Sequence, residues 1–505
     1  MEKHLLSKST FQRGIQCVKS LYLYKNFIQL RDPLSAQQKS IFNRGNNVGI
    51  LAQKLFEGGI DVSKIVTKKN ENYYAELVKK TSELIQKGTD VIYEAAFQHD
   101  RVLVILDILV KKNGQWFAYE VKSSTRVNQT YITDASLQYL VITRSGLQLE
   151  DMSIIIINNQ YVRNGALNIN ELFKIQSVKN EVLLNQEMIE QHLTRLKDVA
   201  GSSQMPDVKI GEHCFNPYNC DFIGTCWKNV PSTSIFDING VQKSELFNLY
   251  NAGYKTISEI PEENNLDKNA NIHIQAHKSG EVLINKPEIE TFLSKISYPL
   301  FFMDFETFMP AIPIYDTTKP YQHIPFQYSI HYKKSKDATL EHFYFLAEQG
   351  SDPRKAFLEN LLKHIGNSGT ILVYDVLMEK NVLNGLKNLY PEYAAHIDAV
   401  LSRFVDLIKP FQEKNYYHPA MKNSFSIKNI LHALVPELSY TELSISSGSI
   451  AMTAFESLQT ETDMFKIIEV RDNLLKYCEL DTLAMVKVLE ILEKAVNEQQ
   501  YNQKH

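Results

Sequence analysis

Apolar and polar residues alternate with several periods along this chain, and the clearest pattern surrounds one dipeptide. Runs rich in β-branched and aromatic residues occupy positions 102–110 and 115–124, on either side of Asn113-Gly114. An Asn-Gly dipeptide between two such runs is the strongest short-range signal for a two-residue β-hairpin. The pattern therefore predicts two antiparallel strands joined at Asn113 and Gly114.

The predicted turn fixes which residues face one another across the hairpin. If Lys112 pairs with Gln115, then Asp107 lies opposite Glu120, and Lys122 lies two residues further along the face of Glu120. Paired residues have Cβ atoms roughly 4.5–5.5 Å apart, so two carboxylates there repel each other unless a divalent cation lies between them. A solvent-exposed carboxylate is the alternative, but the apolar run around Asp107 favours a metal site.

The neighbouring segments alternate between helical and strand periods. They predict an amphipathic helix at 71–88, a strand at 91–97, a helix through 136–146, a strand at 152–159 and a long helical stretch around 170–200. This mixed order indicates an α/β domain with a helix beside a central sheet. Glu94, on the strand before the hairpin, is either a further acidic ligand or a surface glutamate.

A second carboxylate pattern begins in the C-terminal half of the chain. Alternation along an apolar segment places Asp304 and Glu306 on one face of a predicted strand. Further strands are predicted at 324–334, 340–348 and 369–375, with a helix near 353–366. Residues 469–495 form a helical pattern without Gly or Pro, in which Tyr477 and Asp481 are four residues apart and share one face.

Composition narrows the class of protein without indicating a partner. The chain has 505 residues and is 44% hydrophobic and 22% charged, which suits a globular protein of about three domains. The net charge of −4 gives no global basic signature, so any nucleic-acid surface is local. No apolar run reaches membrane-spanning length, and the N-terminus lacks the apolar core of a signal peptide. A cytoplasmic protein without a membrane partner is expected.

Three of the five cysteines lie within 13 residues. Cys214, Cys220 and Cys226 have five residues between successive members, and the candidate fourth ligand is Cys17, nearly 200 residues upstream. In a reducing compartment, cysteines are better read as ligands or buried thiols than as disulfides. Thiolates suit both iron–sulfur clusters and zinc, but zinc more often uses tight Cys-x-x-Cys pairs, so the spacing favours a cluster.

The arrangement Asp107 … Glu120-Val121-Lys122 resembles the core of the PD-(D/E)XK nucleases. The resemblance implies that Asp107 and Glu120 bind Mg²⁺ or Mn²⁺ and that Lys122 orients or activates the attacking water. The family's helix glutamine corresponds to Gln138, but Ile142 stands where its tyrosine is expected, and no counterpart of its upstream histidine is found.

The separated cysteines resemble the iron–sulfur RecB-like members of this family. This resemblance implies a restriction-endonuclease-like fold and a 4Fe-4S cluster, held by Cys17, Cys214, Cys220 and Cys226, that joins the ends of the domain.

The C-terminal pattern resembles the DnaQ-like exonucleases of the RNase H superfamily. Asp304-x-Glu306 is similar to their first motif, and Tyr477-x-x-x-Asp481 to the third motif of the tyrosine subclass of the DEDD exonucleases. The second motif, usually Asn-x-x-x-Asp, reads Asp375-Val-Leu-Met-Glu379 here.

The resemblance implies a two-metal site with Tyr477 orienting the attacking water. Its metal ligands would be Asp304, Glu306, Glu379 and Asp481. Asp375 and Asp406 are further candidate acids. The segment 416–436 carries His418, Lys422 and Lys428, which either line the strand entrance or belong to a solvated loop and helix.

These patterns predict an α/β protein of three domains. A RecB-like nuclease at 1–230 and a DnaQ-like 3′-to-5′ exonuclease at 296–505 would be joined by a small helical connector at 231–295. The connector resembles a helix-hairpin-helix module, with a plain αα-hairpin linker as the alternative.

The expected function is metal-dependent hydrolysis of nucleic acid, DNA rather than RNA, at single strands or ends. One alternative is a nucleic-acid-binding scaffold in which one or both sites have degenerated. Another is a zinc-stapled interaction protein.

Overall fold

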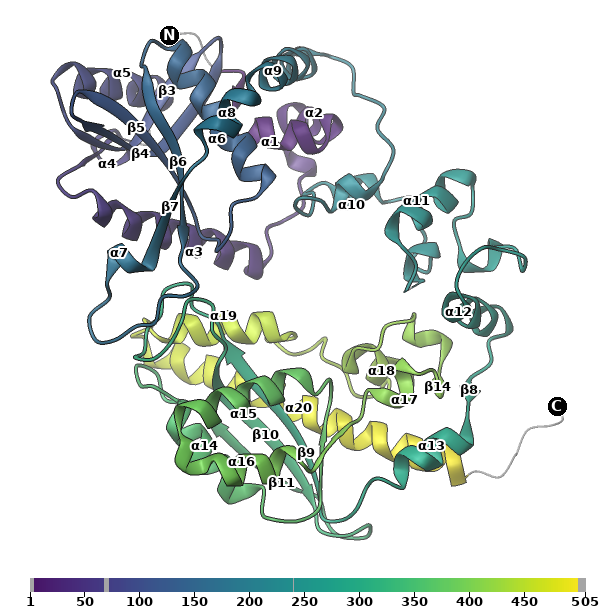
Figure 1. The fold of residues 1–505 in the computed structure, drawn as a ribbon. Helices are drawn as coiled ribbons and strands as arrows, with labels where there is room; N and C mark the ends of the chain where they lie inside the picture. The colour runs from purple at the N-terminus through teal and green to yellow at the C-terminus, as the bar shows by residue number, and fades with distance from the viewer. Residues whose placement is uncertain (1–3, 68–71, 239, 498–505) are drawn as a thin grey trace. The chain divides into compact units, whose positions relative to one another are not determined.

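The computed structural model describes residues 4–67, 72–238 and 240–497. The chain divides into two compact units, one of residues 1–229 with 310–321 and one of residues 230–309 with 322–505. Each unit combines helices with a sheet, which confirms the expected α/β class (Figure 1).

The division into units differs from the three predicted domains in two places. The predicted connector at 231–295 falls within the second unit. Residues 310–321, expected in the C-terminal domain, pack within the first unit, where Ala311 is part of the apolar core.

The first unit is built on a seven-stranded sheet. The β3–β4–β5 meander is antiparallel, β6 runs parallel to β5, and β7 pairs antiparallel with β6 at one edge. The strands in spatial order are β2 (Ile60–Asp61), β3 (Val91–His99), β4 (Val102–Lys112), β5 (Gln115–Lys122), β6 (Leu149–Ile157) and β7 (Phe173–Ser177), and β1 (Leu6–Ser7) pairs with the start of β4.

The hairpin predicted around Asn113-Gly114 is confirmed. Lys112 pairs with Gln115, and Asn113 and Gly114 have φ values of 52° and 84°. Positive φ at both central residues is the requirement of a type I′ turn, whose twist matches that of the strands. The turn therefore sets the register of β4 and β5 as the sequence predicts.

The pairing of β4 with its two neighbouring strands is interrupted at the same position, Asp107. Between β4 and β5 the paired residues end at Ile108 and Tyr119, so Asp107 and Glu120 occupy the next position of the same register. Between β3 and β4, Glu94 occupies the position opposite Asp107, and its φ of 53° interrupts the ladder. The three carboxylates thus belong to one level of the sheet.

Helices cover both faces of this sheet (Figure 1). One face packs against α1 (Lys8–Gln16), α2 (Val18–Asn26), α5 (Tyr73–Gln86), α6 (Gln129–Arg144), α8 (Lys179–Leu184) and α9 (Gln186–Gly201). The other packs against α3 (Ala36–Ala52) and α7 (Ile169–Leu172). The short helices of this unit are α4 (Val62–Ile65) and α10 (Ile223–Cys226).

Two predicted helices have different bounds in the structure. Helix α6 begins at Gln129, seven residues earlier than predicted, because the Asn128 side chain caps it by accepting a hydrogen bond from the Tyr131 amide at 3.0 Å. The helical prediction for 170–200 is wrong over β7, where the chain pairs with the edge of β6 before α8 and α9 begin.

The second unit contains a five-stranded sheet of order β11-β10-β9-β12-β13. Strand β10 is antiparallel to both β9 and β11, whereas β12 is parallel to β9 and β13 is parallel to β12. The strands are β9 (Leu300–Phe308), β10 (Ile324–Lys333), β11 (Glu341–Leu346), β12 (Thr370–Val373) and β13 (Phe404–Asp406).

The alternation predicted for β9 is confirmed by the two cores on either side of it. Phe301, Met303 and Phe305 pack against α14 (Arg354–His364), α15 (Leu377–Leu389) and α16 (Ala394–Leu401). Phe302 packs on the opposite face against α20 (Met464–Asn497), with α13 (Lys286–Leu293), α17 (Lys409–Gln412) and α18 (Ile427–Leu434) in the same core. Asp304 therefore lies on the face that α20 covers.

The remaining elements of the second unit include the predicted connector. Helices α11 (Lys243–Ala252) and α12 (Lys268–Ser279) enclose a small core containing Leu246 and Ile274. Strand β8 (Leu283–Ile284) pairs with β14 (Tyr416–Tyr417), and α19 (Gly448–Leu458) precedes α20. None of the helices in the described part of the chain is both long and apolar enough to cross a membrane.

Candidate active sites

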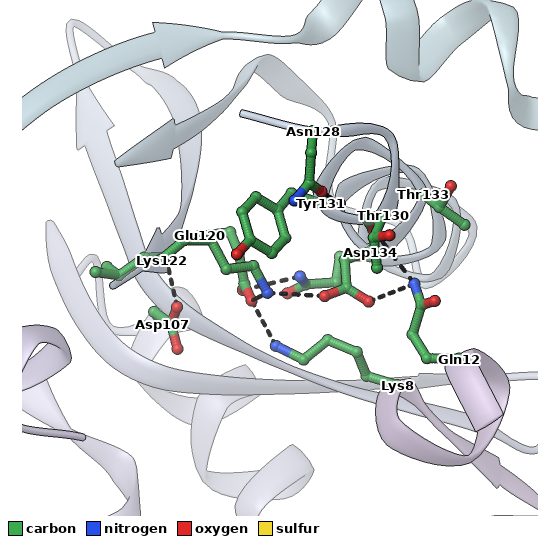
Figure 2. Close-up of polar contacts among 12 residues, drawn as sticks. Lys8, Gln12, Asp107, Glu120, Lys122, Asn128, Thr130, Tyr131, Thr133 and Asp134 are labelled. Atoms are coloured by element: carbon green, nitrogen blue, oxygen red, sulfur yellow. Dashed lines mark hydrogen bonds and ion pairs between the residues drawn. The ribbon is translucent and has the colours of Figure 1, made fainter. Parts of the chain in front are cut away.

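The first candidate centre surrounds Glu120, whose side chain is 1% exposed. Lys8 and Lys122 donate to Glu120 Oε1 at 2.7 and 2.9 Å (Figure 2). Gln138 donates to Glu120 Oε2 at 2.8 Å. Burial alone would raise the pKa of Glu120, but the two lysines outweigh burial and bring the pKa to about 2. Glu120 is therefore ionised at neutral pH.

Asp107 and Glu94 differ from Glu120, because no lysine in the described part of the chain forms an ion pair or hydrogen bond with either carboxylate. Asp107 Oδ2 accepts a hydrogen bond from the Val121 amide at 2.6 Å. Burial and the neighbouring Glu120 raise the pKa of Asp107 to about 8, and burial and Asp61 raise the pKa of Glu94 to about 7. Both carboxylates would be stabilised in the charged form by a cation at this level of the sheet.

The structure adds Asp134 and Gln12 to the predicted residues of this centre. Lys122 Nζ donates to Asp134 Oδ2 at 2.7 Å, and Gln12 donates to Asp134 Oδ1 at 2.6 Å (Figure 2). Asp134 lies one helical turn before Gln138, so helix spacing from Gln138 could have identified it. Lys8 and Gln12 had no signal in the sequence, because they lie more than a hundred residues from their partners.

Helix α1 connects this centre to the cysteine segment. Lys8 and Gln12, four residues apart, reach the carboxylates, whereas Arg13 and Gln16 reach residues beyond position 212. Arg13 forms a two-pronged ion pair with Asp221, one contact of which measures 2.9 Å. One helix thus holds the side chains of both regions in place.

The four predicted cysteine ligands, Cys17, Cys214, Cys220 and Cys226, line one cavity. Cys17 lies between α1 and α2, and Cys226 ends α10. Burial raises the pKa of the Cys17 and Cys226 thiols, and the neighbouring cysteines raise both further. A bound cation would reverse this shift by stabilising the thiolates.

In the described part of the chain, two groups of three metal-ligating side chains have ligand atoms within 4.8 Å of one another, and neither contains a cysteine. The four cysteines therefore line one cavity without forming such a close group of three ligand atoms.

The second candidate centre lies between β9 and α20. Ligand atoms of Asp304, Glu306 and Asp481 lie within 4.8 Å of one another. Burial and the neighbouring carboxylates raise the pKa of Asp304 well above its usual range and that of Glu306 to about 8, and burial raises the pKa of Asp481 to about 6. Three carboxylates at this separation, two of them buried, repel one another unless protons or a cation compensate them.

Glu379 belongs to the same electrostatic cluster. Glu379 is 2% exposed, its Oε2 atom has no hydrogen-bond partner among the residues that the structure describes, and burial raises its pKa to about 8. Asp375 and Asp406 lie at the ends of β12 and β13, where Asp406 Oδ1 accepts from the Asp375 amide at 3.1 Å. Both raise the pKa of Glu379.

Tyr477 shares its surroundings with Lys428, from segment 416–436, and with Tyr440, which the sequence did not identify. Lys428 Nζ lies 3.1 Å from the Tyr477 hydroxyl and 4.7 Å from the centre of its ring. The Tyr440 hydroxyl donates to Asp481 Oδ1 at 2.6 Å. Of the two readings of segment 416–436, the structure therefore places Lys428 at the carboxylate centre.

A family model described as a domain of unknown function (DUF2779) matches residues 301–426, a segment that includes Asp304, Glu306 and Glu379 and ends before Tyr477 and Asp481. A comparison with curated proteins finds no match.

Proposed function

We propose that this protein is a metal-dependent nuclease that hydrolyses phosphodiester bonds of DNA at two separate carboxylate centres. One observation carries the proposal: ligand atoms of Asp304 and Glu306 on β9 and of Asp481 on α20 lie within 4.8 Å of one another. The strand order of that sheet, with three antiparallel strands followed by two parallel ones, supports an RNase H-like fold of the DnaQ type.

The residues of the second centre fit Mg²⁺ or Mn²⁺. Hard cations prefer carboxylate oxygens, and Glu379 Oε2 is buried without a partner. Asp304, Glu306, Asp481 and Glu379 would hold two metal ions, which supply charge stabilisation at the attacking and leaving oxygens. Lys428 donates a hydrogen bond to the Tyr477 hydroxyl, which would orient the attacking water. The second centre would act as a 3′-to-5′ exonuclease.

The first centre is a RecB-type PD-(D/E)XK site. Asp107 and Glu120, with Glu94, would hold the metal ion, while Lys122 positions the attacking water. Asp134 and Glu120 both accept from Lys122 Nζ, so they fix where this ammonium points.

The cysteine cavity fits a 4Fe-4S cluster. The four thiols line one cavity, and the cluster would tie the N-terminal helices to the cysteine segment. Anaerobically purified protein should be brown, and Cys220→Ser should remove its visible absorbance whereas Cys478→Ser, outside the cavity, should retain it. A colourless wild-type protein that holds stoichiometric zinc would contradict the cluster.

A second function is favoured by the two lysines on Glu120. Because Lys8 and Lys122 both neutralise this carboxylate, the first centre would bind nucleic acid without cleaving it, while the second centre does the hydrolysis.

Cleavage of end-labelled DNA in Mg²⁺ or Mn²⁺ tests both proposals. Asp304→Ala should lower cleavage by the second centre, and Lys122→Ala should lower cleavage by the first. Each activity should fall by about 100-fold or more, since each substitution removes several kcal/mol of transition-state stabilisation. The exposed-site variants Asp337→Ala and Lys39→Ala serve as matched controls. Single-stranded, duplex and RNA substrates identify the preferred form, and labels at either end report polarity. Full activity of Lys122→Ala would assign the first centre to binding alone, and full activity of both variants would exclude the nuclease proposal.

A further inference from the structure

The edge of the second unit's sheet carries metal-ligating side chains that neither carboxylate centre uses. His331 and His342 pair directly across β10 and β11, and Glu479 reaches them from α20. One ligand atom of each residue lies within 4.8 Å of those of the other two. Two imidazoles with a carboxylate form a donor set that suits transition-metal ions rather than Mg²⁺.

A chain of hydrogen bonds holds the ring of His331 in place. The Thr482 hydroxyl lies 2.8 Å from His331 Nδ1 and 2.7 Å from Ser329 Oγ, and 3.1 Å from the Glu479 carbonyl. With Nδ1 engaged in this chain, Nε2 is the nitrogen of His331 that is left to bind a metal ion.

The same chain holds the ring of His342. The Ser329 hydroxyl, which contacts Thr482, also lies 2.8 Å from His342 Nε2. The other ring nitrogen, His342 Nδ1, lies 3.9 Å from Glu479 Oε1. Burial and the neighbouring His342 lower the pKa of His331 to about 4, and burial lowers the pKa of His342.

We propose that His331, His342 and Glu479 bind a transition-metal ion of the Zn²⁺ class, which ties α20 to the edge formed by β10 and β11. The Ser329 and Thr482 hydroxyls orient the two rings, as outer contacts of metal-ligating histidines generally do. The half-exposed Glu479 side chain leaves the site open to solvent. Because α20 also carries Tyr477 and Asp481, the ion would fix the helix that presents them.

The zinc content of the full-length protein tests this proposal independently of nuclease activity. After equilibration with Zn²⁺ and removal of the free ion, His342→Ala and Glu479→Ala should each hold one equivalent less than wild type. His396→Ala, at an exposed position of α16, is the matched control and should hold as much as wild type. Equal zinc in all four proteins would overturn the proposal.

Two further measurements separate a metal site from a packing role. Added Zn²⁺ should raise the melting temperature of wild type and His396→Ala but not of His342→Ala. Ser329→Ala should weaken zinc binding about 10–100-fold, the usual cost of losing an outer contact. A zinc-induced rise that persists in His342→Ala, or unchanged affinity in Ser329→Ala, would contradict the assigned geometry.

Discussion

At the scale of single residues, Glu120 holds a charge in the interior because two lysines share it. Removing one partner of a buried ion pair leaves the other poorly compensated. Lys8 lies outside every sequence motif, yet its ammonium is 2.7 Å from Glu120 Oε1, as close as that of the predicted Lys122. Substitution of Lys8 therefore tests how far this second lysine compensates the buried charge of Glu120.

Lys8→Met is expected to destabilise the fold by about 1–3 kcal/mol, less than a fully buried pair because the Lys8 side chain is 28% exposed. The folded-state pKa of Glu120 lies below its usual value of 4.5, so its contribution is present above that pH and is lost as pH falls toward 2. In Lys8→Met the folded-state pKa of Glu120 lies closer to 4.5, so this loss should be smaller and should be complete at a higher pH, and the destabilisation relative to wild type should shrink as pH falls. Urea denaturation between pH 3 and 7, with exposed Lys39→Met as control, measures both effects. A destabilisation by Lys8→Met that stays constant across this pH range would contradict the role of Lys8.

At the scale of elements, α1 joins two regions that are far apart in the chain. Its N-terminal half reaches the first carboxylate centre, and its C-terminal half is held to the cysteine segment through Arg13 and Asp221. Arg31 also donates to Asp221, so this carboxylate anchors two N-terminal segments. The cysteine segment and the first centre should therefore respond together to changes in α1.

Arg13→Ala should lower the free energy of unfolding by about 2–3 kcal/mol, because it leaves a mostly buried Asp221 with one cation fewer. It should also weaken retention of iron in the cysteine cavity. Arg144→Ala removes an exposed ion pair with Glu190 and should change stability by no more than about 0.5 kcal/mol. Iron content and denaturant midpoints compare the two variants, and equal losses in both would exclude a special role for Arg13.

At the scale of the whole molecule, the raised carboxylate pKa values link stability to pH and to divalent cations. Glu306 has a folded-state pKa of about 8 against a usual 4.5, so the folded state keeps a proton that the unfolded chain has lost between these values. Its contribution to stability is therefore present at low pH and declines as pH rises toward 8. A cation that binds the ionised carboxylates should offset this decline.

Glu306→Gln is expected to flatten this decline. Without metal, the variant should gain stability relative to wild type between pH 5.5 and 8, while Mg²⁺ should stabilise wild type more at pH 8 than at pH 5.5. The exposed substitution Glu281→Gln should leave both slopes as in wild type. Denaturant midpoints at the two pH values, with and without Mg²⁺, give the comparison. A constant difference between Glu306→Gln and wild type across this range would refute the linkage.

Local patterns determined the elements and registers of this protein. The Asn113-Gly114 turn set the register that brings Asp107 opposite Glu120, and alternation along β9 placed Asp304 and Glu306 on one face. These predictions succeed because turn type and side-chain period depend on neighbouring residues alone. The edge strand β7 was missed because its pairing partner, rather than its own pattern, makes it a strand.

Only the tertiary structure decided which distant side chains meet. Lys8 is 112 residues from Glu120, and Lys428 is 49 residues from Tyr477, so no periodicity connects them. The His331–His342 pair follows from the antiparallel register of β10 and β11, but Glu479 and the hydroxyls that orient the rings come together only when α20 packs on that face. The carboxylate motifs could thus be predicted from the sequence. The charges and hydrogen bonds that set the protonation of these carboxylates arise from packing between segments far apart in the chain.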